Sequence, residues 1–378
     1  MSAVADDTTP GADGQSATTE DLDVAKLPGL DRALRQIAAH ADRLDAEPAF
    51  PTEAFRALAG TGALGCTLPD RRGKRIVFAE ELGLLQAVAR ADGSVGRILD
   101  GHLNAVERLT LTCPGVLDHG DLEAIIAGQL LLGVWGADPA RGEGRPVELR
   151  ATGGTMVLSG VKTYCSGAGG VQQALVVARD HAHERRLVLV DLARGVQVDR
   201  SWYRASGLRA SESHRVVFDN APVRAVLGGP GELLREPWFS RDAIRTSATW
   251  AGIAHSVVDA ALRVVRARPN PSEMVALAVG RMLVALGTTR HWLRDAAACA
   301  DDNRSLGAVA IEARWAIAGA AREIASEAAL ACGSHPLATG GALSRGRRDL
   351  DLFLLQHRLD TLLARHGARV LGQGTRNE

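Results

Sequence analysis

The sequence predicts an α+β fold in which a small β-domain separates two helical domains. Apolar residues recur at helical spacing early in the chain, as in LDRALRQIAAHADRLDAE, where Leu30, Leu34 and Ile37 share one face. Short β-type runs follow, among them TMVLSGV, ALVVA and RLVLVDL, and clusters of Gly, Asp and Asn separate them. Helical periodicity returns with SATWAGIAHSVVDAALRVV and continues in long Ala-rich segments.

These changes of pattern divide the 378-residue chain into four segments. We expect a disordered tail at 1–26, a helical domain at 27–130, a small β-barrel or sandwich at 131–230 and a four-helix bundle at 231–378. The Ala-rich bundle has more apolar stripes than one small domain needs, which predicts a homo-oligomer.

Composition and charge exclude several classes of protein. Lys plus Arg and Asp plus Glu both number 44, and aromatic residues are only 4% of the chain, so we expect no nucleic-acid partner. No apolar stretch is long enough for a membrane span, and no signal peptide is predicted. The odd number of cysteines, five, without CxxC spacing indicates reduced thiols in a cytoplasmic protein and no metal site.

Several strings resemble the acyl-CoA dehydrogenase superfamily of flavoproteins, in the same order along the chain. Rossmann, P-loop, GxSxG and HExxH motifs are absent from the sequence. The resembling strings are FAEELGLLQAVARADGSVGRILDGH, GVWGADP, MVLSGVKTYCSGAGG, GLRASESHRVVFDNAPV, RTSATWAGIAHSVVDAALRVVRAR and GSHPLATGGALSRGRRDLDLFLLQH. They cover nearly the whole chain from about residue 28.

The resemblance implies an FAD-dependent oxidoreductase that dehydrogenates an acyl thioester at its α and β carbons. A base would remove the α-proton while hydride passes to the flavin. An electron-transfer flavoprotein or a flavin reductase would be the redox partner. Two alternatives stay open: a two-component flavin monooxygenase or oxidase of the same fold, and a non-catalytic family member that acts as a scaffold or partner subunit.

The resemblance implies flavin contacts from two segments, namely Trp135, Gly136, Ala137, Tyr164, Cys165 and Ser166. Tyr164 stands where the family usually has a Trp beside the isoalloxazine, and Ser166 stands where a Thr hydroxyl reaches the N5 side of the ring. Ala137 replaces the usual Thr of the first wall, so one hydrogen bond is missing there. The alternative is that Trp135 and Tyr164 are packing residues of the sheet.

The family's usual phosphate-binding strings are not present in this chain. Where relatives have Arg-Gln-x-Phe-Gly, whose Arg binds the FAD pyrophosphate of a neighbouring subunit, the sequence reads ARPNPSEMVALAVGRM. Arg266 or Arg268 is a candidate replacement. The Ser of the family's GAGSD loop is also replaced, within PARGEGRP.

Two residues are candidates for the catalytic base. In most relatives a Glu lies nine residues beyond the Arg of a terminal Arg-Asp pair, and counting from Arg348 leads to His357. Other relatives place the base early in the first bundle helix, where Asp242 stands. Three possibilities follow: Asp242 is the base of a dehydrogenase, His357 is a base or donor of a monooxygenase, or neither is catalytic.

The charged run at 347–349 precedes the last amphipathic segment. We expect Asp349 in the first turn of a helix, where a carboxylate interacts favourably with the helix dipole. The residue therefore has a predicted structural role.

Overall fold

A computed structural model describes residues 26–70, 73–302, 304–356 and 359–372 of the chain. The predicted disordered tail at 1–26 lies outside these residues, except for Lys26. Among the described residues, no helix is long and apolar enough to cross a membrane.

The first part of the chain is helical, as the periodicity predicts. Its helices are α1 (Leu30–Ala46), α2 (Thr52–Ala59), α3 (Phe78–Ala91), α4 (Gly93–Thr112) and α5 (His119–Ile126), with a 3-10 turn at Ala63–Gly65. The side chain of Asp92 caps α4 by accepting a hydrogen bond from the backbone N–H of Val95 at 3.0 Å.

The middle of the chain forms one seven-stranded sheet. Its strands are β1 (Leu132–Trp135), β2 (Glu148–Thr152), β3 (Thr155–Cys165), β4 (Gln173–Arg179), β5 (Arg185–Asp191), β6 (Val196–Asp199) and β7 (His214–Leu227). The pairing runs β4-β2-β3-β7-β5, and β5 pairs again with β4, so these five strands form a closed ring. β1 is added to β4 in parallel, and β6 is added to β7. This closure leaves few unpaired strand edges.

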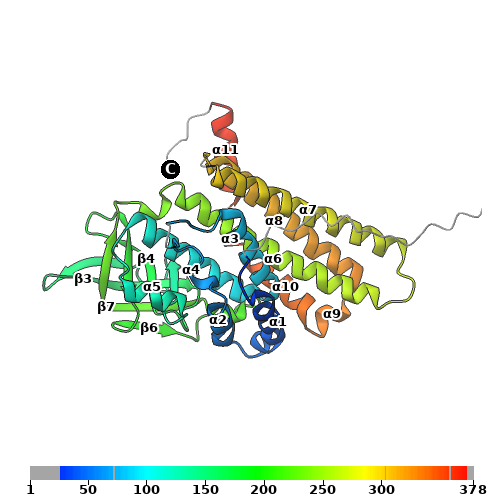
Figure 1. Ribbon diagram of the computed structural model, residues 1–378, viewed down its shortest axis with the longest axis horizontal. Coiled ribbons are helices and arrows are strands. Elements are labelled where there is room, and N and C mark those ends of the chain that lie inside the picture. The colour runs from blue at the N-terminus through cyan, green and yellow to red at the C-terminus, as the bar shows by residue number, and fades with distance from the viewer. Residues whose placement is uncertain (1–25, 71–72, 303, 357–358, 373–378) are drawn as a thin grey trace, which may run out of the picture.

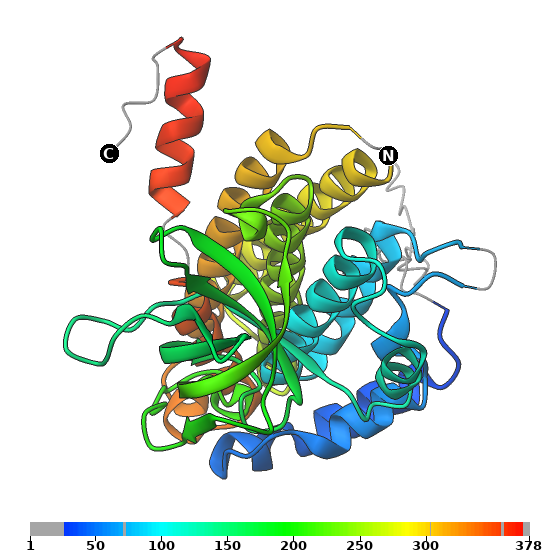
Figure 2. The same cartoon turned by 90° about the vertical axis from the view of Figure 1, so that its left-hand side faces the viewer.

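The last part of the chain is again helical. Its helices are α6 (Trp238–Arg266), α7 (Glu273–Asp301), α8 (Gly307–Cys332), α9 (His335–Ala338), α10 (Ala342–Phe353) and α11 (Leu359–Val370). Figure 1 shows α6, α7 and α8 side by side, with the strands at the opposite end of the molecule. In Figure 2 the sheet stands in front of these helices, and α11, in red, projects away from them. The predicted fold class, helical then β then helical, is confirmed.

α3 and α4 lie between the sheet and the long C-terminal helices (Figure 1). α3 and α6 approach closely at Gly252, where an added Cβ would lie 2.3 Å from the backbone oxygen of Gln86. Any larger residue at this position would push the two helices apart. This close contact fixes how α6 is presented to the neighbouring α4.

Apolar side chains are exposed along α7 and at several points of α8 and α11. They are Met274, Leu277, Leu283, Val284, Trp315, Leu330, Val370 and Leu371. The homo-oligomer and the division at residues 26, 130 and 230 into separate domains stay predictions.

Candidate functional site

α4 carries a row of polar side chains along one of its faces. Arg97, Asp100, Asn104 and Arg108 follow one another at intervals of three or four residues. Residues at these intervals lie on one helix face, so the four side chains form a single polar stripe. Because the helix is covered by the sheet and by α6, this stripe is largely buried.

α6 presents a matching stripe to α4, and α8 adds one more side chain. Asp242, Thr246 and Trp250 recur at intervals of four on α6. The guanidinium carbon of Arg314, on α8, lies 5.4 Å from the centre of the Trp250 ring. With two serines of the β-domain these residues form the junction cluster: Arg97, Asp100, Asn104, Arg108, Ser166, Ser213, Asp242, Thr246, Trp250 and Arg314.

A chain of hydrogen bonds runs from the β-domain into the helices. The hydroxyl oxygens of Ser213 and Ser166 share a hydrogen bond of 2.9 Å, and Arg97 Nε donates to Ser166 Oγ at 3.3 Å. Arg97 Nη1 donates to Asp100 Oδ2 at 2.9 Å, and Thr246 Oγ1 donates to the same oxygen at 3.1 Å. The Ser166 hydroxyl and the Asp100 carboxylate are therefore linked through a single guanidinium group.

A second branch holds Asp242. Asn104 Nδ2 donates to Asp242 Oδ1 at 2.6 Å, and Arg108 Nε donates to Asn104 Oδ1 at 3.0 Å. Arg108 Nη2 also donates to the backbone oxygen of Leu233 at 2.9 Å. Asp242, the candidate base on α6, thus lies within the junction cluster with one carboxylate oxygen already occupied.

Asp100 is the carboxylate whose proton affinity is most relevant to the cluster. Its side chain is fully buried, and this burial raises its pKa to about 6. Arg97 opposes the rise, whereas the nearby charge of Asp242 adds to it. A carboxyl group with this pKa exchanges its proton close to neutral pH.

Tyr164, the second-last residue of β3, has an unusual backbone conformation. Its φ of 52° lies in the left-handed region, which a tyrosine rarely adopts, and its residue surface is 58% exposed. The ring meets Trp202 edge-on, with 5.0 Å between the ring centroids. Tyr164 is thus largely exposed to solvent two residues before Ser166.

The other predicted flavin-contact segment, residues 135–137, begins at the last residue of β1. Trp135 is buried, and its Nε1 donates to the backbone oxygen of Ser166 at 3.1 Å. Gly136 and Ala137 follow it toward the surface, and Ala137 is exposed. Cys165 is buried, which raises the pKa of its thiol well above the ordinary value. The Trp135 side chain therefore helps to hold the backbone of Ser166 in place.

Asp349 holds the loop that carries Ser211 and Ser213, and it does so from the interior of α10. The expectation of a first-turn position was wrong, because the helix begins seven residues earlier, at Ala342. Asp349 Oδ1 accepts a hydrogen bond from the backbone N–H of Leu208 at 2.5 Å, where φ is 48°. Burial raises the pKa of Asp349 to about 7, although the Leu208 N–H lowers it.

The remaining predicted residues have other positions. His357 lies outside the described residues. Arg268 donates to the backbone oxygens of Ala331 and Cys332 at the end of α8, and Arg266 is exposed. In the described part of the chain, no group of three or more His, Cys, Asp or Glu residues could hold a metal ion.

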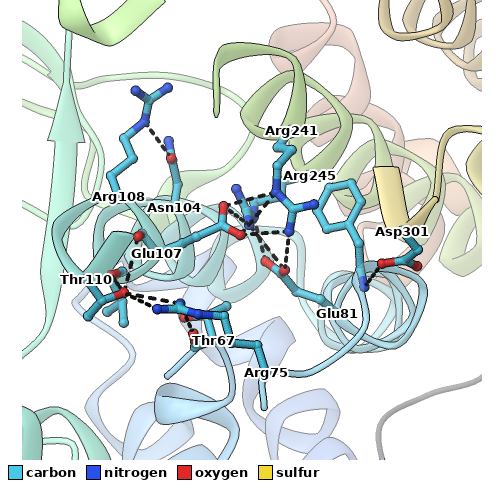
Figure 3. Close-up of polar contacts among 12 residues, drawn as sticks. Thr67, Arg75, Glu81, Asn104, Glu107, Arg108, Thr110, Arg241, Arg245 and Asp301 are labelled. Carbon is cyan, nitrogen blue, oxygen red and sulfur yellow. Dashed lines mark hydrogen bonds and ion pairs between the residues drawn. The ribbon is translucent and has the colours of Figure 1, made fainter. Parts of the chain in front are cut away.

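A network of buried ion pairs lies on α3, α4 and α6, directly beside the junction cluster (Figure 3). Arg245 Nε donates to Glu81 Oε1 at 2.5 Å, and Arg245 Nη2 donates to Glu107 Oε2 at 2.5 Å. Arg241 Nη2 donates to Glu107 Oε1 at 2.7 Å, and its guanidinium carbon lies 3.9 Å from the centre of the Phe78 ring. Burial would raise the pKa of Glu107, but Arg245 and Arg241 outweigh it and lower the pKa to about 2. The network fixes α4 and α6 relative to each other.

Some buried polar atoms of the junction cluster have no hydrogen-bond partner among the described residues. They are Asp100 Oδ1, Trp250 Nε1, Arg314 Nε and Arg314 Nη2. Buried polar groups are nearly always hydrogen-bonded in proteins, so unpaired atoms in one place mark a position for a ligand or for water. The ion-pair network uses all four of its carboxylate oxygens, although one of its donors, Arg245 Nη1, also has no hydrogen-bond partner among the described residues.

Sequence reasoning missed Arg97, Asp100 and Arg314. A signal for the first two was available, because polar residues recur at helical spacing within the buried helix of RILDGHLNAVER. Arg314 gave only a weak signal, as an arginine among the alanines of ARWAIAGAA. A groove of about 510 Å³ between α1, α3, α6 and α10 contains none of the junction cluster.

Comparison with known proteins agrees with this architecture. Residues 226–355 match the family model described as acyl-CoA dehydrogenase, C-terminal domain. No curated protein sequence matches the chain significantly.

Solved structures of similar fold cover nearly the whole chain. KijD3 in complex with FMN and a dTDP-linked amino-keto sugar is 23% identical, with a TM-score of 0.80 over 93% of this chain and 94% of that chain. TdsC from Paenibacillus sp. A11-2 with FMN and indole is 18% identical, with a TM-score of 0.81 over 91% and 96% of the two chains. A nitrososynthase from Micromonospora carbonacea var. africana is 24% identical, with a TM-score of 0.79 over 93% and 99%.

Proposed function

Because the chain has the acyl-CoA dehydrogenase-like fold, we propose that it is a flavin-dependent monooxygenase. It would use reduced FMN supplied by a separate flavin reductase. Structures of KijD3 and of TdsC contain FMN, and TdsC is described as a dibenzothiophene monooxygenase. These similarities support the proposal through the fold.

The observation that carries the proposal is the state of the two carboxylates in the junction cluster. Asp100 accepts hydrogen bonds from Arg97 and Thr246, and Asp242 accepts one from Asn104. A dehydrogenase needs a carboxylate directed at the α-proton of its substrate, whereas here one oxygen of each carboxylate is already engaged by donors. Hydroxyl and guanidinium donors around a buried site are instead suited to stabilising a developing oxyanion.

The residues at the end of β3 fit a flavin ring. Tyr164 is an exposed aromatic residue that could contact the ring, and Ser166 Oγ, held by Arg97 and Ser213, can reach the ring edge as a hydrogen-bond partner. The unpaired atoms of Asp100 and Trp250 add buried polar groups that a bound molecule would satisfy. When bound, reduced flavin supplies the electrons with which oxygen is activated.

FMN fits the phosphate contacts of this chain better than FAD does. Arg268, a candidate for binding the pyrophosphate, is engaged by the backbone oxygens at the end of α8. The strings that bind the FAD pyrophosphate in the family are also replaced. A mononucleotide needs fewer such contacts, so we expect FMN to bind more tightly than FAD.

The side chains of the cluster then have separate tasks. Arg97 orients Ser166 and Asp100 at once, because its Nε and Nη1 donate to the two residues. Asp100, with its pKa raised to about 6 by burial, can hold or release a proton at Oδ1, which has no partner in the described residues. Burial of Asp100 and Trp250 keeps bulk water away from this end of the site.

Binding and turnover experiments test the proposal. The protein should bind reduced FMN anaerobically and oxidise a substrate only when oxygen is added. Ser166→Ala should lower this oxidation at least tenfold, because the variant loses the hydroxyl expected at the ring edge. Ser159→Ala, on the same strand but outside the cluster, is the matched control and should behave as wild type. Failure to bind any flavin would instead favour the non-catalytic alternative.

Dehydrogenation of an acyl thioester is the second candidate function. It is favoured by the position of Asp242 in the junction cluster, where Oδ2 makes no hydrogen bond with the described residues. In that case FAD would be the cofactor, and an electron-transfer flavoprotein would accept the electrons. Anaerobic mixing of the flavin-loaded protein with a panel of acyl-CoAs distinguishes the two functions, because only a dehydrogenase would bleach its flavin.

A further inference from the structure

Arg314 is a buried cation that lacks a direct partner in the described part of the chain. Its residue surface is 3% exposed, and neither Nε nor Nη2 has a hydrogen-bond partner among the described residues. It projects from the Ala-rich α8 toward α6, where its guanidinium carbon lies 5.4 Å from the centre of the Trp250 ring. Contact with an aromatic face attracts a cation but does not satisfy in-plane N–H donors. A guanidinium in this position is costly to fold unless something else pairs with it.

The neighbours of Arg314 do not supply that pairing. Asp242 and Asp100 lie close enough to raise the pKa of Arg314, but burial dominates and lowers the pKa to about 10. The group is therefore still a cation at neutral pH. Asp100 is bound by Arg97 and Thr246, and Asp242 is bound by Asn104.

The charges of the junction cluster leave an excess of one cation. Three guanidinium groups, those of Arg97, Arg108 and Arg314, face two carboxylates, those of Asp100 and Asp242. The adjacent network of Glu81, Glu107, Arg241 and Arg245 is neutral in itself and cannot compensate. One further anion would therefore balance the charge of the junction cluster.

A second unpaired donor lies beside Arg314. Trp250 Nε1 is buried and has no hydrogen-bond partner among the described residues. A planar oxyanion can accept two parallel hydrogen bonds from a guanidinium, and a carboxylate oxygen has a further lone pair for an indole N–H. The two side chains together offer donors of the kind that one small oxyanion accepts.

We propose that Arg314 and Trp250 bind a carboxylate or similar small oxyanion of the substrate. This inference rests on the proposed monooxygenase function, and it names the class of substrate: an organic anion whose charged end lies between α6 and α8. The reacting end of the substrate is then directed toward Ser166 at the β-domain. The same oxyanion chemistry has a second source, the phosphate of FMN, and the experiment separates the two.

The test measures binding of small anions to the full-length protein without flavin, at constant ionic strength. Benzoate and propionate are compared with benzamide and propionamide, by thermal melting and by tryptophan fluorescence. Wild type should bind each carboxylate at least tenfold more tightly than its amide. Arg314→Gln should abolish this difference, and Arg314→Lys should retain part of it. Arg322→Gln, which changes an exposed arginine of the same helix, should leave it unchanged.

Two results would overturn the inference. Equal binding of carboxylates and amides by wild type contradicts it, and this comparison needs no variant to fold. Weaker binding of FMN to Arg314→Gln, with unchanged binding of riboflavin, would assign Arg314 to the flavin phosphate instead. If carboxylates bind as expected but reduced flavin and oxygen give no turnover, the proposed function fails while the anion site stands. Turnover without any preference for anions would instead overturn the anion site and support the proposed function.

Discussion

Two clusters of buried charge lie side by side on α4 and α6, and they differ in how their charges are paired. In the ion-pair network, Arg241 and Arg245 occupy every carboxylate oxygen of Glu81 and Glu107. In the adjacent junction cluster, Arg314 and other buried groups have atoms without partners in the described residues. The first arrangement fixes helices, and the second leaves groups available to a ligand. One atom of the network, Arg245 Nη1, also lacks a hydrogen-bond partner among the described residues, so the two clusters differ in their carboxylates: those of the network are fully paired, whereas Asp100 Oδ1 is not.

Breaking the ion-pair network should have the largest effect on stability. Arg245→Gln leaves Glu81 and Glu107 buried with fewer cations, and removing one partner of a buried pair costs about 3–5 kcal/mol. Urea unfolding measures this loss. Arg263→Gln, an exposed change on the same helix, should alter the free energy of unfolding by less than about 0.5 kcal/mol. A similar small loss for Arg245→Gln would show that the network does not hold α4 and α6 together.

The next largest effect is the dependence of stability on pH that arises from Asp349. Its folded-state pKa of about 7 lies above the ordinary value of 3.8, so its contribution to stability is present at low pH and is lost as the pH rises toward 7. Stability should therefore fall by up to ~1.4 kcal/mol per pH unit in this interval. Asp349→Asn keeps an acceptor for the Leu208 N–H and should remove that slope.

Thermal melts between pH 4 and pH 8 measure the slope for Asp349. Asp351→Asn is the matched control, because this residue lies on the same helix and is exposed. If the wild type and Asp349→Asn show the same dependence on pH, Asp349 is not the titrating group.

The pKa of Asp100 predicts how activity depends on pH. Its pKa, raised by burial to about 6, predicts an inflection near pH 6 in the pH profile of turnover. Asp100→Asn should abolish the inflection and lower the rate about tenfold or more, because the proton at Oδ1 is lost. Asp242→Asn should lower the inflection to a more acidic pH, since the charge of Asp242 helps to raise the pKa of Asp100. An inflection that persists in Asp100→Asn would assign it to another group.

The smallest effect on stability is expected at Arg314. Arg314→Gln removes a buried charge that has no direct partner among the described residues, so the free energy of unfolding should change by less than about 1 kcal/mol or increase. The free energy of unfolding of Arg245→Gln, measured under the same conditions, allows the two clusters to be compared directly. A loss of about 3 kcal/mol at Arg314 would mean that the cation has a structural partner.

The order of helices and strands could be predicted because each element carries its own periodicity. The segment around Ser166 could be located because a string of neighbouring residues resembles a known pattern. The junction cluster could not be predicted from the sequence. Asp100, Thr246 and Arg314 lie far apart along the chain and meet only when α4, α6 and α8 pack. Asp349 was misplaced for a related reason: the Gly-rich stretch before it hides a helix that begins at Ala342.

The release of hydrogen peroxide from reduced FMN tests the central claim most directly, because it needs no knowledge of the substrate. Reduced FMN is mixed with oxygenated buffer, with and without a stoichiometric amount of protein, and peroxide is followed over time. A monooxygenase should retain the reactive flavin away from water and slow the release at least tenfold, and Ser166→Ala should restore much of the rate. A rate of release unchanged by the wild-type protein would contradict the proposed function.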